Sequence, residues 1–236
     1  MEELKTVLFD LVLSVGPACR PAQQLKHAGL RFTAAPMDWM ELYPLSAVTR
    51  LFQTGFSDFF TDIREEDPDP NRKNRRVVDV ANTVTSIHHF PTKKSLAAGQ
   101  KEMRRTMLRR YHRVDKLLRR AQAVCLVGNR EDDPAALLAF LSDMRSLYPQ
   151  ARWFMVNMES VDDNIYYVNK MTQDGLTLYQ VRFRDVHPDG PDIEENPLAW
   201  HGNTPMWQQT LAQVRLRPGA ERTGRSLRER LFRTKR

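Results

Sequence analysis

Short apolar runs that alternate with amphipathic segments limit the fold of this chain more than any other feature. Residues 6–15 (TVLFDLVLSV) form the first run, which is typical of a strand buried on both faces. Gly16 and Pro17 end this strand, and residues 21–28 then favour a helix. The same order of strand, turn and helix returns at residues 123–148. Such alternation predicts an α/β fold in three layers, with a mostly parallel sheet and helices on both faces.

The remaining pattern completes this prediction. We expect the first run to be a central strand of the sheet, because it carries almost no polar residue. Residues 62–75 contain two prolines and dense charge, which indicates a surface loop. The other predicted strands are 76–80, 84–87, 123–127, 152–157, 164–169 and 175–184, and the other predicted helices are 44–53, 96–121, 134–148 and 204–214.

Composition indicates a globular protein in the cytoplasm. Hydrophobic residues make up 41% of the chain and charged residues 28%, a mixture that can bury a core. There is no apolar run long enough to span a membrane, and the acidic start of the chain lacks the features of a secretory signal. The two cysteines, Cys19 and Cys125, have no zinc-binding spacing, so we predict free thiols and neither a metal nor a cofactor.

The net charge of +7 lies in the last part of the chain. Residues 1–214 hold 27 basic and 27 acidic residues, whereas residues 215–236 hold 9 basic and 2 acidic ones. We therefore predict a single α/β domain at 1–214 and a basic extension from Arg215 to Arg236, whose end starts as a helix at Ser226. This tail is either a plain terminal extension or an anchor for an anionic membrane surface or an acidic partner. Nucleic-acid binding is not favoured, because no aromatic residues are interleaved with the arginines.

The turn after the first strand carries the strongest candidate site. Open α/β sheets bind ligands at the carboxyl ends of their strands, where Gly16, Ala18 and Cys19 are expected to lie. A thiol in the first turn of a helix is exposed to the positive end of the helix dipole, which lowers its pKa. Cys19 is thus a candidate nucleophile, and the amides around it, together with Arg20, are candidates to hold an oxyanion or another anion. A small buried cysteine without chemistry is the alternative, and it is our interpretation of Cys125.

A nucleophilic thiol needs a base, and the chain offers one histidine pair. His88 and His89 follow a predicted strand, and either imidazole reaches Cys19 if residues 84–87 run beside the first strand. His201 is a weaker candidate. Asp38 either orients a histidine or caps the turn that follows it, and Asn157 is another candidate orienting residue.

Several of these residues follow the pattern of a known family. The chain resembles bacterial proteins described as papain-like cysteine peptidases, whose pattern runs Ser-Leu-Gly, a Cys three residues later, Gly-Leu-Arg and Pro-Phe-Asp-Trp. Here the matching stretches are 14–19, 29–31 and 36–39, followed by His88, Phe90, an Arg-rich helix and Trp200, Gly202 and Trp207. The resemblance spans roughly residues 8–214. Val15 and Met37 replace the usual Leu and Phe, and His89 stands where the family has Asp.

The resemblance implies Cys19 as nucleophile, His88 as base, with His89 as the alternative, and Asp38 as their partner. A papain-like fold would pair a long helix with an antiparallel barrel, and the strand–helix alternation favours the parallel α/β fold instead. Our first hypothesis is a cysteine-dependent hydrolase or acyl transferase. The alternative is a non-catalytic or transferase-like module that binds a sugar phosphate or nucleotide at the same edge, and a third hypothesis is an interaction protein that docks through its tail.

Overall fold

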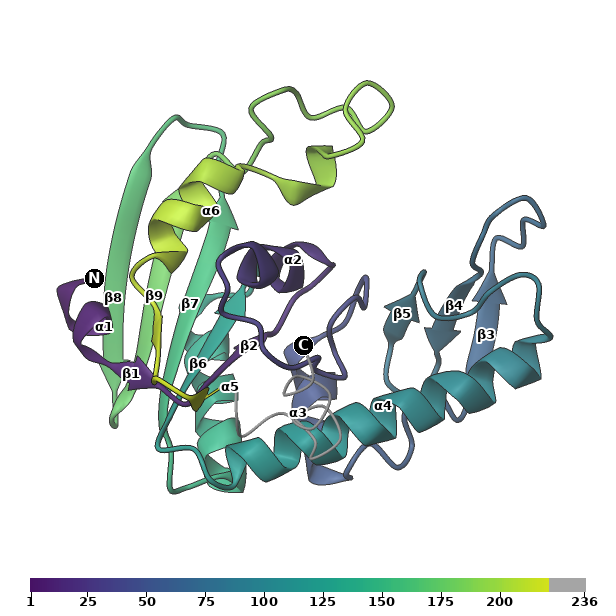
Figure 1. Cartoon of the computed structure of the whole chain (residues 1–236), viewed down its shortest axis with the longest axis horizontal. Coiled ribbons are helices and arrows are strands. Elements are labelled where there is room, and N and C mark those ends of the chain that lie inside the picture. The colour runs from purple at the N-terminus through teal and green to yellow at the C-terminus, as the bar shows by residue number, and fades with distance from the viewer. Residues whose placement is uncertain (221–236) are drawn as a thin grey trace, which may run out of the picture.

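The computed structural model describes residues 1–220 and shows a mixed α/β fold, as predicted (Figure 1). Its main sheet has five strands in the order β2-β6-β7-β9-β8. These strands are β2 (Leu11–Ser14), β6 (Ala123–Gly128), β7 (Arg152–Ser160), β9 (Leu176–Phe183) and β8 (Tyr166–Gln173). The helices are α1 (Glu2–Thr6), α2 (Arg20–His27), α3 (Leu45–Gln53), α4 (Leu96–Leu118), α5 (Pro134–Leu147), the 3-10 helix η1 (Ala199–His201) and α6 (Thr204–Leu211).

The sheet is parallel except at one edge. β2 pairs with β6, β6 with β7, and β7 with β9 in parallel, whereas β8 runs antiparallel to β9. The prediction that the first strand is central was wrong, because β2 is an edge strand. It resembles a central strand in sequence because residues of the 35–43 segment pack with it in the core and every one of its residues is buried.

A single aspartate divides the first apolar run into two strands. Asp10 lies between β1 (Leu8–Phe9) and β2, and its carboxylate accepts hydrogen bonds from the amides of Gln122 and Ala123 at 2.8 and 3.0 Å. β1 leaves the main sheet and pairs in parallel with β10 (Arg215–Leu216). Residues 215–216, which the sequence assigned to the basic extension, therefore pair with β1. The division into a domain at 1–214 and an extension from Arg215 stays a prediction. The predicted helix from Ser226 falls outside the described residues.

Hydrophobic residues pack on both faces of the main sheet, because neighbouring residues of a strand point to opposite sides. Leu11 and Leu13 of β2 belong to one buried cluster, which includes side chains of α3, α4 and α5. Val12 belongs to a second cluster with side chains of α1, α2 and α6. The second cluster, which contains Leu25 of α2 as well as Val12, packs α2 against this face of the sheet.

A small antiparallel sheet lies beside the main body of the protein. β4 (Arg76–Asp79) pairs with β3 (Ile63–Glu66) and with β5 (Val84–Ser86). Figure 1 shows α4 running along the base of the molecule from the main sheet to this small sheet. Phe90, which follows β5, is buried against Gly99 of α4, where an added Cβ would come within 3.1 Å of its ring. The segment after β5 is thereby held at a fixed position relative to the main sheet.

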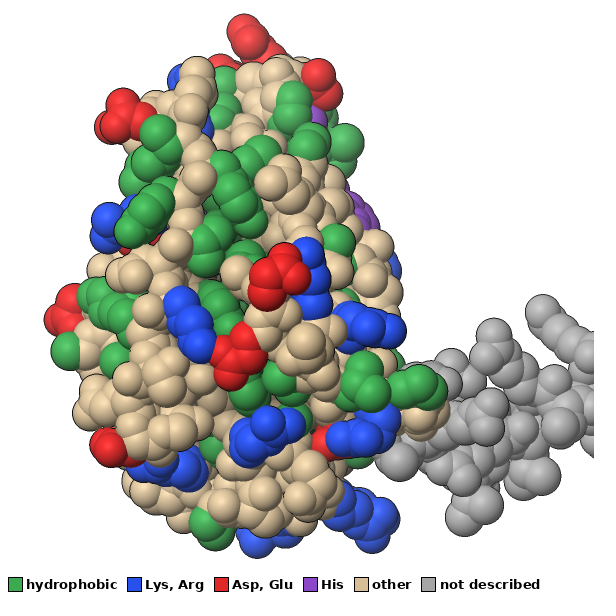
Figure 2. Space-filling view, turned by 90° about the vertical axis from the view of Figure 1, so that its left-hand side faces the viewer, with side chains coloured by type: hydrophobic (Ala, Val, Ile, Leu, Met, Phe, Trp, Pro, Cys, Tyr) green, Lys and Arg blue, Asp and Glu red, His purple; other side chains and the backbone are tan. Residues whose placement is uncertain are grey.

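The opposite edge of the main sheet is more exposed. Figure 2 shows the side of the molecule on which α1 and β8 lie, with hydrophobic side chains in a band between charged ones. Tyr166 and Tyr167 of β8 are both exposed. Among the described residues, no helix has the length and apolar character needed to cross a membrane.

Candidate functional site

Cys19 lies at the carboxyl end of β2, at the start of α2. The turn between them requires Gly16, whose φ is +29° and where an added Cβ would lie 2.3 Å from the Tyr43 hydroxyl. Ala18 also has a positive φ, and its amide donates to the Glu41 carbonyl at 2.8 Å. The Cys19 side chain is half-buried and is presented at the sheet edge on which the sequence placed it.

A short extended segment brings His88 to this turn. The Glu41 amide donates to the Thr85 carbonyl at 2.8 Å, and the Thr85 amide donates to Leu42 at 3.0 Å. Residues 40–42 therefore lie between β5 and the turn that holds Cys19, since Glu41 bonds to both. Residues 84–87 do not run beside the first strand, the arrangement on which the sequence made this contact conditional, because β5 pairs with β4. Cys19 and the segment after β5 meet through residues 40–42 instead.

The thiol and one imidazole are within hydrogen-bond distance. Cys19 Sγ lies 3.2 Å from His88 Nε2. His89, the alternative base, instead has its Nδ1 2.9 Å from the Ser86 hydroxyl and does not line the cavity at Cys19. Burial and the positive charge of Arg110 lower the pKa of His89 to about 3, so this ring stays neutral at physiological pH. The structure thus pairs Cys19 with His88.

The thiol and the imidazole open into a cavity of about 430 Å³. Two tryptophans form part of its wall: the ring centroids of Trp39 and Trp200 are 6.4 Å apart, and Trp39 also lies edge-on to His88 at 6.2 Å. The residues that line the cavity are Ala18, Cys19, Arg20, Trp39, Glu41, Ile87, His88, Asn129 and Trp200.

Burial and nearby carboxylates keep the Cys19 thiol protonated. Its pKa is raised to about 11, first because the sulfur is removed from water and then because Glu41 and Asp38 carry negative charge. The sequence predicted a lowered pKa from the helix dipole, whereas burial and the two carboxylates raise it. Burial also lowers the pKa of His88, while the Glu41 carboxylate raises it. The resting pair is therefore a neutral thiol next to a neutral imidazole.

Asp38 stabilises the turn and makes no hydrogen bond to a histidine within residues 1–220. It is buried, and its carboxylate accepts hydrogen bonds from Arg31 at 2.6 and 2.9 Å, from the Ala35 amide at 2.9 Å and from the Ser14 hydroxyl at 2.5 Å. These contacts join the end of β2 to the 31–38 segment. The carboxylate that acts electrostatically on both Cys19 and His88 from within the cavity is Glu41, which the sequence analysis did not identify.

Two groups predicted to hold an anion are engaged elsewhere. The Ala18 amide binds Glu41, as described above. The Arg20 guanidinium donates to the buried Asp185 at 2.7 Å and to the Trp200 carbonyl at 2.9 Å. Asp185 also accepts a hydrogen bond from the Trp207 indole at 3.0 Å. Arg20 therefore fixes Trp200 beside α2, and the guanidinium predicted to hold a sugar phosphate or nucleotide already has a carboxylate partner.

Other donors at the cavity remain free. The backbone amides of Cys19 and Arg20, at the start of α2, donate to no group within residues 1–220. Asn129 follows β6 and lines the cavity; its Oδ1 is buried without a partner, and its amide nitrogen makes no hydrogen bond to a described residue. Asn157, proposed from sequence as an orienting residue, binds the backbone of Arg130 and the Gln180 side chain instead. Asn129 follows the end of a strand, and that position in the sequence could have identified it as a site residue.

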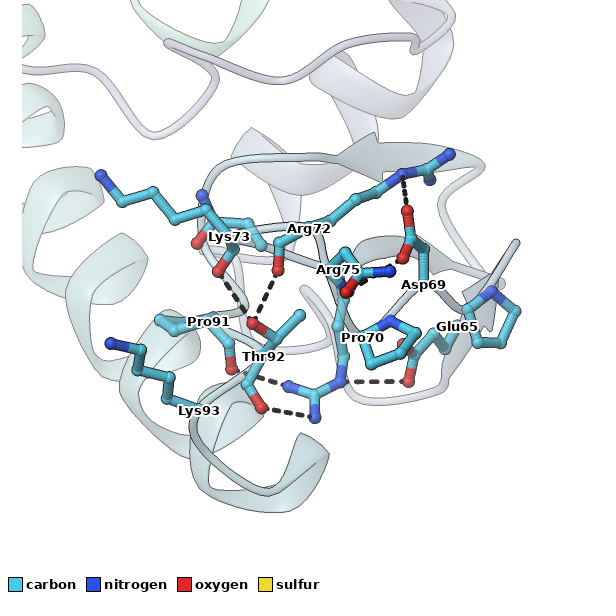
Figure 3. Close-up of a pocket in the computed structure, with 12 residues that line it drawn as sticks. Glu65, Asp69, Pro70, Arg72, Lys73, Arg75, Pro91, Thr92 and Lys93 are labelled. Atoms are coloured by element: carbon cyan, nitrogen blue, oxygen red, sulfur yellow. Dashed lines mark hydrogen bonds and ion pairs between the residues drawn. The ribbon is translucent and has the colours of Figure 1, made fainter.

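A larger cavity lies elsewhere in the described part of the chain, and its lining contains neither a cysteine nor a histidine. It measures about 710 Å³ and is formed by the loops around residues 65–75 and 91–93. Figure 3 shows its Arg75 bound to Glu65 and to the carbonyls of Pro91 and Thr92, so that this guanidinium is fully engaged. Residues 1–220 also contain no group of three His, Cys, Asp or Glu side chains arranged to hold a metal ion.

Comparison with known proteins gives one match. Residues 10–152 fit the model of the family described as "Putative papain-like cysteine peptidase (DUF1796)", a range that includes Cys19, His88 and Asn129. No curated protein and no solved structure matches the chain.

Proposed function

The chain belongs to this family of papain-like cysteine peptidases, and from that premise we propose that it is a cysteine-dependent hydrolase or acyl transferase. The observation that carries the proposal is the 3.2 Å contact between Cys19 Sγ and His88 Nε2 at the wall of a cavity that admits a small acyl group. Cys19 is the nucleophile, and His88 is the general base and acid.

In the first step the sulfur attacks the carbonyl carbon of an amide, ester or thioester. The S–C bond forms as the thiol proton moves to His88 Nε2, and the carbonyl π electrons move to oxygen. Because the resting thiol is protonated, His88 removes the proton during the attack. The negative charge of Glu41 stabilises the imidazolium that results and offsets part of the lowering of the His88 pKa by burial.

Collapse of the tetrahedral intermediate breaks the bond to the leaving group. The electron pair on oxygen restores the carbonyl, and His88 gives its proton to the departing nitrogen, oxygen or sulfur. Water then attacks the acyl-enzyme and passes a proton to His88, and the Cys19 sulfur leaves and takes that proton back. A second nucleophile in place of water makes the reaction an acyl transfer.

The developing oxyanion needs donors that are already in place. The free backbone amides of Cys19 and Arg20 lie at the positive end of the α2 dipole. The unengaged amide nitrogen of Asn129, on the neighbouring strand end, is a third candidate donor. The two backbone amides belong to the N-cap residue and the first residue of α2, so the helix fixes their positions.

Intact-mass analysis of the acyl-enzyme tests the proposal. We expect p-nitrophenyl acetate to acetylate Cys19 and to be turned over, with no turnover by the Cys19→Ala variant. His88→Ala should slow acetylation about 10²-fold or more. His89→Ala is the matched control, because this neighbouring ring does not line the cavity, and it should retain turnover. Equal rates for wild type and Cys19→Ala, or equal losses for the two histidine variants, would contradict the proposal.

A further inference from the structure

The four tryptophans of the chain fall into two pairs with different environments. Trp153 and Trp207 are fully buried, and their indole N–H groups donate to the Tyr148 carbonyl and to Asp185. Trp39 is half-buried and Trp200 is 36% exposed, and neither indole N–H donates to a described residue. Both of these rings line the cavity of Cys19. Packing in the hydrophobic core therefore explains the presence of the first pair, whereas it does not explain the second pair.

Trp39 and Trp200 together form a continuous apolar surface, which we call the indole wall. Their centroids lie 6.4 Å apart at 61°, a contact distance that leaves no space for a ligand between the rings. A substrate group therefore packs on the wall from the cavity side. One end of the wall touches His88 through Trp39, and the other end, Trp200, is anchored by its carbonyl to Arg20 at the start of α2.

The two charged side chains that line the cavity each already have an ionic partner. Arg20 is paired with Asp185, and Glu41 is paired with Arg76. Near the nucleophile, a substrate can therefore contact the indole wall, the Ile87 side chain and the polar Asn129. Apolar walls with a few polar groups are typical of sites that bind an apolar ligand group and orient it.

Accepting the proposed function, we infer that the indole wall selects acyl groups that carry an aromatic or broad aliphatic side chain next to the scissile carbonyl. In the proposed reaction, the free amides of Cys19 and Arg20 hold the carbonyl oxygen, and Trp200 is fixed beside Arg20. A side chain on the acyl part therefore contacts the Trp200 end of the wall. The leaving group lies on the His88 side, where its proton is delivered.

Hydrolysis of N-acetyl amino-acid S-ethyl thioesters with Phe, Leu, Ala, Lys or Glu side chains tests the inference, because ethanethiol is too small to use the wall. Acid product is measured by chromatography, and the Cys19→Ala rate is subtracted as background. We expect kcat/KM for Phe and Leu to exceed that for Ala by about tenfold or more. Trp200→Ala should reduce this ratio to about threefold or less.

The controls separate the inference from the proposed function. Trp200→Ala keeps the backbone carbonyl that Arg20 binds, and Tyr167→Ala removes an exposed aromatic ring from β8 and should keep the full preference. Equal rates for all five thioesters, or a preference for Lys or Glu, would overturn the inference and leave a cysteine hydrolase. Absence of any hydrolysis that depends on Cys19 would instead remove the proposed function.

Binding to the inactive protein tests the wall without any chemistry. In saturation-transfer NMR, N-acetyl-phenylalanine amide should bind Cys19→Ala protein more tightly than N-acetyl-alanine amide. The added Trp200→Ala substitution should abolish that difference. Equal binding of the two amides to Cys19→Ala protein would reject the wall even if no thioester is hydrolysed.

Discussion

The alkylation rate of Cys19 by iodoacetamide should be low at neutral pH and should keep rising up to about pH 11. Only the thiolate reacts, and the burial of the sulfur together with the charges of Glu41 and Asp38 raises the pKa from 9.0 to about 11. At pH 8 a thiol with the lower pKa is about 9% ionised and one with the higher pKa about 0.1%, so the rate should be about 90-fold below that of an ordinary thiol.

Peptide mapping by mass spectrometry after short exposures measures this rate at Cys19 separately from Cys125, which is buried. Between pH 7 and 10 the rate should rise about tenfold per pH unit. Glu41→Gln removes one of the two charges and should lower the pKa, which increases the rate at a given pH. A wild-type midpoint below pH 9 that rises in His88→Ala would refute the reasoning, because it would show a resting thiolate–imidazolium pair.

The remaining predictions concern the dyad and the residues that hold it. His88→Ala should lower kcat/KM in thioester hydrolysis by about 10²- to 10⁴-fold, whereas the melting temperature should change little. Asn129→Ala should lower kcat by about tenfold to hundredfold with a smaller change in KM, if its amide holds the oxyanion; an effect on KM alone would assign it to substrate binding. Asp38→Ala leaves Arg31 partly buried without its carboxylate and should cost about 3 kcal/mol of unfolding free energy, measured in urea. Gly202→Ala places a Cβ 2.2 Å from a buried carboxylate oxygen at a φ of +67° and should cost more than about 2 kcal/mol; an unchanged urea midpoint would contradict that packing.

Local patterns in the sequence were sufficient to locate most elements. The run at 123–127 becomes β6, and Pro134 starts α5 as expected, because a buried parallel strand and a proline-initiated helix each have a strong local signal. The order of the strands in the sheet could not be predicted from such local patterns. β2 lies at the edge of the main sheet, and residues from the 35–43 segment share its buried cluster, although nothing in their own pattern indicates that contact.

The candidate site also has a part that the local sequence predicts and a part that it does not predict. Cys19 was located because the carboxyl end of a strand and the start of a helix can both be identified from the local sequence. The contact with His88 depends on hydrogen bonds that join Ala18, Glu41 and Thr85, three residues from separate parts of the chain. No periodicity encodes such a link. For the same reason the charge of Glu41 and the free amide of Asn129 became apparent only once the segments were placed in space.

The division of the site between two regions of the chain has a consequence for specificity. Cys19, His88 and the inner half of the indole wall, Trp39, lie within the residues matched by the family model, which ends at residue 152. The outer half, Trp200, lies beyond that range and is held in place by Arg20 and Asp185. In the proposed function, the chemistry therefore depends on the region that defines the family, whereas the proposed recognition of the acyl group depends partly on a later segment. Replacement of residues 187–201 by a segment of different sequence should thus change the preferred acyl side chain. The rate of Cys19 acetylation by p-nitrophenyl acetate should be preserved.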